Sequence, residues 1–292
     1  MSFVTVNHRT IYRYREPVVL GEHRMMFRPR EGHDLRLIRS SLLISPQPTR
    51  LRWLHDLFDN SVAIANFDGA TTSLSFDSRV TLEHFDSTQP DYPIEDYARR
   101  YPFRYSDDDF PNLGRALGSS YDAETVANWA LRFLDAADDT ATMNILTAMA
   151  RGIHEDFTYA RRVEKGVQRP AETLRLGCGS CRDFAVLMME AVRSLGIAAR
   201  FVSGYIFTPN GAGLIGGGAT HAWMQAYLPG AGWIDFDPTN SIIGNRNLIR
   251  VAVAWSPEHV LPLYGTYFGP PDSFIAMDVE VHVTEASAHL DS

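Results

Sequence analysis

The sequence contains only two cysteines among its 292 residues, and they stand three positions apart at Cys178 and Cys181. Such a pair cannot build a disulfide framework, so a hydrophobic core has to hold the fold together. No apolar run approaches the ~20 residues that a membrane helix needs. The first residues, MSFVTVNHRTIYRY, are polar where an export signal would be apolar. We therefore expect a cytoplasmic protein with no membrane contact.

The sequence also lacks an excess of positively charged residues. Lys and Arg number 27 against 35 Asp and Glu, a formal net charge of −8, which argues against a broad surface for nucleic acid. The sequence shows no repeat and no low-complexity tract. What remains is the composition of an ordinary globular protein, 45% hydrophobic and 21% charged. Because 292 residues exceed one small core, we expect two domains.

Residues 1–86 show the alternation that is typical of β-strands. In the first strand, alternating side chains form one face: Val4, Val6, His8, Thr10, Tyr12 and Tyr14. Four further segments have strand character: 35–45, 60–67, 73–76 and 79–85. Turns rich in proline, glycine and aspartate separate them. This spacing predicts an all-β, sandwich-like N-terminal domain.

Residues 87–120 break this alternation with several prolines and the acidic run Asp107–Asp109. The segment is also rich in tyrosine and phenylalanine, which argues against a free linker. We expect a connecting segment that wraps on a surface.

Residues 121–265 predict a mixed second domain. Two apolar stripes at helical spacing predict helices: Val126, Trp129, Ala130 and Phe133, then Met143, Leu146, Met149, Ala150 and Ile153. Strands are expected at 197–206, 220–228 and 232–239, in an antiparallel meander. In the final segment, 266–292, alternating valines at 279, 281 and 283 predict a strand that can return to the N-terminal sheet. The whole chain therefore has the pattern of an α+β protein.

The segment GCGSCRDFAVLMMEAVRSLG, residues 177–196, predicts a buried amphipathic helix. Its apolar residues recur at i, i+3, i+4 and i+7. We expect Ser180 as the N-cap and Gly196 as the C-cap. Cys181 then lies in the first turn, where unpaired N–H groups and the helix dipole stabilise a thiolate and can bind an oxyanion.

Two downstream residues can turn Cys181 into a nucleophile. A nucleophilic cysteine needs a base for its proton and a third group that orients the base. His221 lies at the start of the strand 220–228, and Asp237 follows across one hairpin turn. Adjacent antiparallel strands can place the two side by side. Asp235 lies on the same strand face as Asp237, so spacing alone leaves both as candidates for the acid.

These residues belong to four blocks that occur in order: GSCRDFAVL at 179–187, GIAARFVSGY at 196–205, HAW at 221–223 and GWIDFDPT at 232–239. Together they resemble the transglutaminase-like superfamily of papain-like folds. Four blocks of the first domain resemble the β domain that precedes this core in bacterial transglutaminase-like proteins: HRTIYRY at 8–14, FRPRE at 27–31, SPQP at 45–48 and DLFDNSV at 56–62. Asp59 stands where that family usually has glycine. The resemblance covers nearly the whole chain.

The resemblance implies a Cys-bearing helix packed on an antiparallel sheet, with an all-β domain in front. It implies Cys181 as nucleophile, His221 as base and Asp237 as orienting acid, which the D-P-T match favours over Asp235. The expected activity is cysteine acyl transfer on a peptide or protein substrate, without metal or cofactor. We favour a protease or amidase that hydrolyses peptide or isopeptide-like amides. A transglutaminase with an amine acceptor and a non-catalytic binding module are the alternatives.

Simpler interpretations exist for several of these features. Cys178 and Cys181 form C-x-x-C, which can serve redox chemistry or, with His221, bind zinc. No second cysteine pair and no thioredoxin-like βαβ unit accompany them, so we interpret Cys178 as a packing residue. Trp223 is expected in the core. The glycine-rich loop 211–218 is either a hairpin tip or a flap over the cleft.

Overall fold

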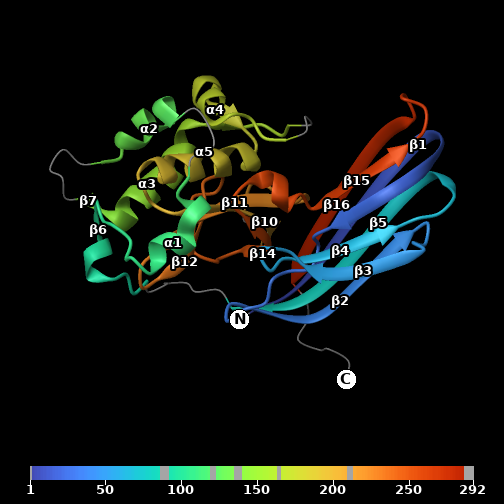
Figure 1. Cartoon of the computed structure of the whole chain (residues 1–292), viewed down its shortest axis with the longest axis horizontal. Helices are drawn as coiled ribbons and strands as arrows, with labels where there is room; N and C mark the ends of the chain where they lie inside the picture. Colours follow the sequence, from blue (N-terminus) through green and yellow to red (C-terminus); the bar gives the residue numbers. More distant parts are fainter. Residues whose placement is uncertain are drawn as a thin grey trace.

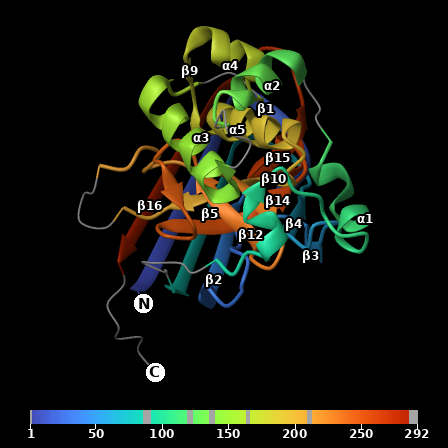
Figure 2. The same ribbon diagram turned by 90° about the vertical axis from the view of Figure 1, so that its left-hand side faces the viewer.

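The computed structural model describes residues 2–85, 92–118, 123–134, 140–162, 166–208 and 213–285. They form two lobes: a curved β-sheet, and a mixed lobe in which helices cover a second sheet (Figures 1 and 2). The chain is an α+β protein, as the sequence predicted. Within the described residues, no helix is long and apolar enough to cross a membrane.

The N-terminal sheet has seven strands: β1 (Ser2–Met25), β2 (Leu35–Ser45), β3 (Arg50–His55), β4 (Ser61–Asn66), β5 (Ala70–His84), β15 (Leu263–Phe268) and β16 (Phe274–Glu285). Their order is β2-β5-β1-β4-β3, and β15 and β16 also pair with β1. In Figure 1 the red β16 runs beside the blue β1, and Val6 lies opposite Val283 in the antiparallel register. The strand expected around Val279–Val283 therefore returns to the first domain.

The described strands of this lobe form one hydrogen-bonded sheet, where the sequence suggested a sandwich-like domain. β1 is 24 residues long and pairs with four strands, and its register against β5 shifts between Arg13 and Val18. Irregular pairing of this kind bends a strand and increases its twist. The sheet can therefore curl over its own apolar cluster, which includes Val18, Leu74 and Phe76.

Two details differ from the expected strands. The segments 73–76 and 79–85 are one continuous strand, β5, because its pairing with β1 continues past Ser78. β3 was not expected. All six of its residues are exposed, although Leu51 and Trp53 alternate with Arg50 and Arg52; the alternation spans only four residues, the shortest run that indicates a strand.

The described part of the connecting segment, residues 92–118, lies on the mixed lobe. It contains η1 (Asp96–Ala98), β6 (Arg100–Tyr101), α1 (Asp109–Leu113) and η2 (Gly114–Ala116). The Tyr105 hydroxyl donates to the Tyr227 carbonyl at 2.8 Å and accepts the Ala198 N–H at 2.8 Å. Ile94 is buried in the main core of the molecule. These contacts hold the aromatic-rich segment against the second lobe.

Besides α1, the described part of the mixed lobe contains the helices α2 (Ala123–Leu131), α3 (Thr142–Asp156), α4 (Pro170–Leu176) and α5 (Cys181–Ser194). The two predicted apolar stripes supply buried residues of α2 and α3 to the core. α4 was not expected. It has proline in its first turn and ends at Gly177, which has a φ of 61°. Three short strands connect the helices: β7 (Thr140–Ala141), β8 (Thr158–Tyr159) and β9 (Cys178–Gly179).

The second sheet contains β10 (Ala199–Ile206), β11 (His221–Leu228), β12 (Gly232–Asp237), β13 (Ile242–Ile243) and β14 (Leu248–Ala254). Its order is β13-β12-β11-β10-β14, so β10, β11 and β12 form the predicted meander. Residues of α5 pack on one face of the sheet. The other face carries Val202, Trp223 and Val253, against which Phe58 of the N-terminal lobe packs. After β14, η4 (Pro257–Val260) leads back to β15.

Asn60, in the DLFDNSV block, makes the central contact between the lobes. Its side-chain amide donates to the Val253 carbonyl at 2.8 Å and accepts the Val253 N–H at 2.9 Å. Arg30, in the FRPRE block, donates to the side-chain oxygen of Asn60 at 3.0 Å. The Asp56 carboxylate accepts the backbone N–H and the side-chain N–H of Asn60, each at 2.9 Å. These blocks therefore tie the first domain to the sheet that carries the candidate site.

Candidate active site

Cys181 is the first residue of α5, as the sequence predicted. The preceding residues are held by β8 and β9, in which Tyr159 pairs with Gly179, and the Ala160 N–H donates to the Gly179 carbonyl at 2.8 Å. The residue is buried, with 7% of its surface exposed. Its N–H has no partner inside the helix because it lies in the first turn. The fold thus presents a thiol and a helix N-terminus at one point.

Asp183 fixes this helix start. One carboxylate oxygen accepts the N–H and the hydroxyl of Ser180 at 2.8 and 2.7 Å. The other accepts the Gln168 N–H at 2.6 Å and the Arg162 guanidinium at 2.8 Å. Sequence reasoning missed this role. The Ser-x-x-Asp spacing at the start of the helix was a usable signal, because it resembles a capping box.

His221 is the first residue of β11, and Gly204 of β10 is its cross-strand neighbour. Its Nε2 lies 2.8 Å from the Oδ2 of Asp237, the last residue of β12. The imidazole and the carboxylate are both fully buried. The structure therefore brings these two predicted site residues together as a hydrogen-bonded pair.

The charge balance around His221 favours the imidazolium. Burial alone would lower the pKa of His221, but the charge and hydrogen bond of Asp237 and the interaction with Cys181 raise it to about 10. Nδ1 is buried and makes no ordinary hydrogen bond within the described residues. The thiol of Cys181 is therefore a neighbour of the imidazole in a looser contact, as is common for a nucleophile and base before substrate binds.

Asn240 links Asp237 to the glycine-rich loop. Its side-chain N–H group donates to Asp237 Oδ2 at 2.8 Å and to the Ile215 carbonyl at 3.0 Å. Its carbonyl oxygen accepts the Ile215 N–H at 2.7 Å. Asn240 stands directly after the D-P-T block, so its position next to the acid was visible in the sequence, but its contact with the loop was not.

The described part of the glycine-rich loop covers the His221 ring. Gly216 has a φ of +100°, and a Cβ atom built there would lie only 2.6 Å from His221 Nδ1. Backbone therefore approaches the imidazole more closely than a side chain would allow. The Gly218 carbonyl accepts the Val281 N–H of β16 at 3.2 Å, which joins the loop to the N-terminal sheet. Residues 211 and 212 of the loop lie outside the described residues.

Tyr159 pairs with Gly179, two residues before Cys181. Burial raises the pKa of Tyr159, and the charges of Cys181 and Asp183 raise it further, while Arg161 and Arg182 oppose this effect. The sequence located no side-chain oxyanion donor near this position.

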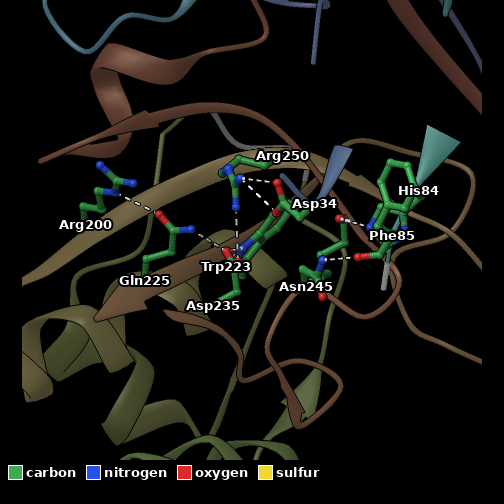
Figure 3. Close-up of polar contacts among 10 residues, drawn as sticks. Asp34, His84, Phe85, Arg200, Trp223, Gln225, Asp235, Asn245 and Arg250 are labelled. Carbon is green, nitrogen blue, oxygen red and sulfur yellow. Dashed lines mark hydrogen bonds and ion pairs between the residues drawn. The ribbon is translucent and has the colours of Figure 1, made fainter. Parts of the chain in front are cut away.

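Asp235, the alternative acid, points into a different network (Figure 3). Its Oδ1 accepts the Trp223 indole N–H at 2.6 Å and the Gln225 amide at 2.8 Å. Its Oδ2 lies 3.3 Å from Arg250. Asp237, and not Asp235, is therefore hydrogen-bonded to His221. Trp223 is fully buried, as expected.

Cys178 is half-buried in β9 and is a free thiol, as is Cys181. Among the residues that the structure describes, no group of three or more His, Cys, Asp and Glu side chains is arranged to hold a metal ion.

Residues 127–238 match the transglutaminase-like superfamily, and residues 4–83 match the bacterial transglutaminase-like N-terminal region. Residues 127–238 therefore belong to the transglutaminase-like superfamily. The superfamily match runs from α2 to Pro238, so it contains Cys181, His221 and Asp237. The N-terminal match contains the blocks that carry Arg30, Asp56 and Asn60.

Some relatives of this transglutaminase-like chain span nearly its whole length, and others match only part of it. An uncharacterized protein of Mycobacterium tuberculosis is 29% identical over 311 residues, which cover 97% of this chain and 93% of the relative. An uncharacterized protein of Mycobacterium leprae is 38% identical over 105 residues, 35% of this chain and 37% of that protein. The crystal structure of a candidate cysteine protease from Cytophaga hutchinsonii has a TM-score of 0.70 at 17% identity, over 99% of this chain and 92% of the other. That similarity shows a shared two-lobed fold.

Proposed function

We propose that this transglutaminase-like protein is a cysteine acyl-transfer enzyme that hydrolyses peptide or isopeptide-like amides. Cys181 acts as nucleophile, His221 as base and then acid, and Asp237 as the group that orients His221. The observation that carries the proposal is the buried His221–Asp237 pair, 2.8 Å apart, beside a cysteine at a helix N-terminus. The reaction uses no metal and no cofactor.

The chemistry follows from these positions. The sulfur of Cys181 attacks the amide carbon and forms a C–S bond, while the carbonyl oxygen becomes an oxyanion that the backbone N–H of Cys181 can bind. The imidazolium of His221 donates its proton to the leaving amine as the C–N bond breaks. A water molecule then gives a proton to neutral His221 and attacks the thioester carbon; the C–S bond breaks, a carboxylic acid is released, and the Cys181 thiolate and His221 imidazolium are restored. Asp237 stabilises the imidazolium at each step.

The first half of this reaction is shared with transglutaminases. If an amine replaces water in the second half, the product is a new amide and the enzyme is a transglutaminase. The residues around Cys181 are compatible with both acceptors. We favour water, and we expect a peptide or protein substrate because the net charge of −8 disfavours nucleic acid. Incubation of an acylated enzyme with a primary amine and mass analysis of the product decides between the two acceptors.

The first test is the pH dependence of alkylation at each cysteine, followed by peptide mass mapping. A free thiol titrates near ~8.5, whereas a thiol paired with an imidazolium at a helix start can titrate at roughly 3.5–7.5. We expect Cys181 to react rapidly at mildly acidic pH in the wild type and to lose this reactivity in His221→Ala. An ordinary thiol profile for Cys181 in both proteins would contradict the proposal and favour a binding module.

Cys178 provides the matched control. If the two cysteines formed a redox pair, Cys178→Ser would abolish activity; acyl transfer by Cys181 predicts little effect. Labelling of Cys181 by a thioester or vinyl-sulfone probe in Cys178→Ser would support the proposal, and labelling that requires Cys178 would contradict it.

We also propose that the protein works in the cytoplasm, since its low cysteine content, two in 292 residues, fits that location. Fractionation of the source cells tests this, and recovery of the protein outside the cytoplasm would refute it.

A further inference from the structure

A continuous chain of polar contacts runs from the N-terminal lobe to the sheet that carries His221 (Figure 3). It begins at Asp34, in the turn before β2. Both carboxylate oxygens of Asp34 accept the Nη2 of Arg250 on β14, at 3.2 and 3.0 Å. The Nη1 of the same guanidinium donates to Asp235 on β12 at 3.3 Å. One arginine therefore connects a carboxylate of the first domain to a carboxylate of the second.

The chain continues from Asp235 to Trp223. The carboxylate accepts the indole N–H at 2.6 Å. Because the indole has a single donor, at one edge of the ring, any rotation of the ring would break this hydrogen bond. Asp235 and Trp223 are both buried, at 5% and 0% exposure. Burial raises the pKa of Asp235 and the charge of Asp34 adds to this rise, whereas the charge of Arg250 and the hydrogen bonds from Trp223 and Gln225 oppose it. The carboxylate form that holds the indole therefore depends on Arg250.

The chain ends at the candidate base. The Trp223 and His221 rings stack with centroids 5.9 Å apart and planes inclined by 29°. The two residues are separated by one position on β11, so their side chains project from the same face of the strand. The imidazole thus has Asp237 at its Nε2, Gly216 against its Nδ1 and Trp223 beside its plane. Of these three neighbours, the indole is the one that the described residues link to a charged group of the N-terminal domain.

We propose that Asp34 is a positioning residue that acts on His221 through Arg250, Asp235 and Trp223. The N-terminal domain then forms part of the machinery of the candidate site, since it completes the ion pair that fixes the indole against the imidazole. This inference rests on the proposed role of His221 in acyl transfer. A second branch, from Asp235 through Gln225 to Arg200, leads away from His221 and serves as an internal comparison.

The structure separates this positioning role from simple attachment of the lobes. Asn60 attaches the N-terminal lobe to β14, because its side chain makes two hydrogen bonds with Val253. Among the described residues it makes none with Arg250. Loss of Asp34 alone leaves those bonds in place. We therefore expect Asp34→Asn to keep the two lobes together while it weakens the hold on Trp223.

The test is a double-mutant cycle with Asp34→Asn and Trp223→Phe, read as the rate and pH midpoint of Cys181 alkylation by iodoacetamide. Each single change should slow alkylation at pH 6, on the order of tenfold, which is within the range of coupled neighbours. The double variant should be no slower than Trp223→Phe alone, because the indole is the route by which Asp34 acts. Asp34→Glu, which keeps the charge, should restore part of the rate.

Asp77→Asn is the matched control. Asp77 also lies in the N-terminal sheet and also pairs with an arginine, Arg9 at 3.1 Å, but the pair is half exposed and far from β14 in the topology. In Asp77→Asn, Cys181 should be alkylated at the wild-type rate. Thermal unfolding of every variant shows whether a slow rate reflects loss of the fold.

Three results would overturn the inference. Cys181 could be alkylated equally fast in Asp34→Asn and Asp77→Asn, or the pH midpoint of its alkylation could be unchanged in Asp34→Asn. The rate in the double variant could also fall by the product of the two single-variant effects. If Asp34→Asn does not fold, Trp223→Phe decides alone, and full reactivity in that variant refutes the last step. An ordinary thiol profile in the wild type refutes the proposed function itself, and the inference falls with it.

Discussion

Gly216 offers the sharpest test of how closely the glycine-rich loop controls His221. In Gly216→Ala, the new methyl carbon would lie 2.6 Å from His221 Nδ1, whereas ordinary van der Waals contact begins at 3.4 Å. The loop and the imidazole must therefore separate by about 0.8 Å. A misplacement of about 1 Å near a reacting group can cost roughly a hundredfold in rate. We expect a tenfold to hundredfold loss of Cys181 reactivity, as an order of magnitude.

Gly218→Ala separates this contact from backbone strain. Gly218 belongs to the same loop and has a φ of +82°, but a Cβ atom there would meet nothing within 4 Å. Both variants carry the strain of a left-handed alanine, about 1–3 kcal/mol. Only Gly216→Ala displaces the ring. The difference between the two variants therefore measures the contact with His221.

The assay is Cys181 alkylation at pH 6, combined with thermal unfolding of both variants. We expect similar unfolding temperatures and a slower reaction only in Gly216→Ala. Wild-type alkylation in both variants would refute the close approach of the loop to the imidazole. A loss of equal size in both would mean that loop strain, and not the position of the ring, limits the thiol.

Four other predictions follow from the site. Acyl transfer should fall as the pH rises through about 10, because the pKa of His221 is raised to that value and the imidazolium is the proton donor; a rate–pH profile that falls near 7 would contradict this. Asp237→Asn should lower the rate roughly 10²–10⁴-fold while the fold is retained, as in related triads, and a near wild-type rate would contradict the orienting role. Asn240→Ala should lose about 1–3 kcal/mol of unfolding free energy and slow Cys181 alkylation, because it removes hydrogen bonds to a buried carboxylate. Asp183→Asn should lose about 3–5 kcal/mol in urea unfolding, because it leaves buried donors at the start of α5 without their charged acceptor; stability within 1 kcal/mol of wild type, as an order of magnitude, would refute this.

Much of the fold could be predicted because its elements are defined by local periodicity. The stripes around Trp129 and Met149 marked two helices, and the run 35–45 coincides with β2. β3 was missed because its alternation, from Arg50 to Trp53, spans only four residues and the strand has no buried face. α4 was missed because seven residues are too short for a helical stripe to emerge.

The candidate site was likewise predictable only in part from the sequence. Cys181 at a helix start, His221 at a strand start and Asp237 beyond one hairpin follow from spacing and block order, and the structure joins His221 to Asp237 by a hydrogen bond. The choice between Asp235 and Asp237 rested on the D-P-T resemblance. The hydrogen bond from Asp237 to His221, and the different partners of Asp235, needed the coordinates.

By itself, the sequence determined the elements and their order, because hydrophobic periods, caps and turns act within a few neighbouring residues. It also placed a nucleophile, a base and two possible acids along the chain. Only the tertiary structure decided which groups surround the imidazole. Gly216, Asn240, Trp223 and the ion pair from Asp34 to Arg250 depend on contacts between residues up to 216 positions apart. Contacts at that separation arise from the packing of two lobes, and no local pattern in the chain records them.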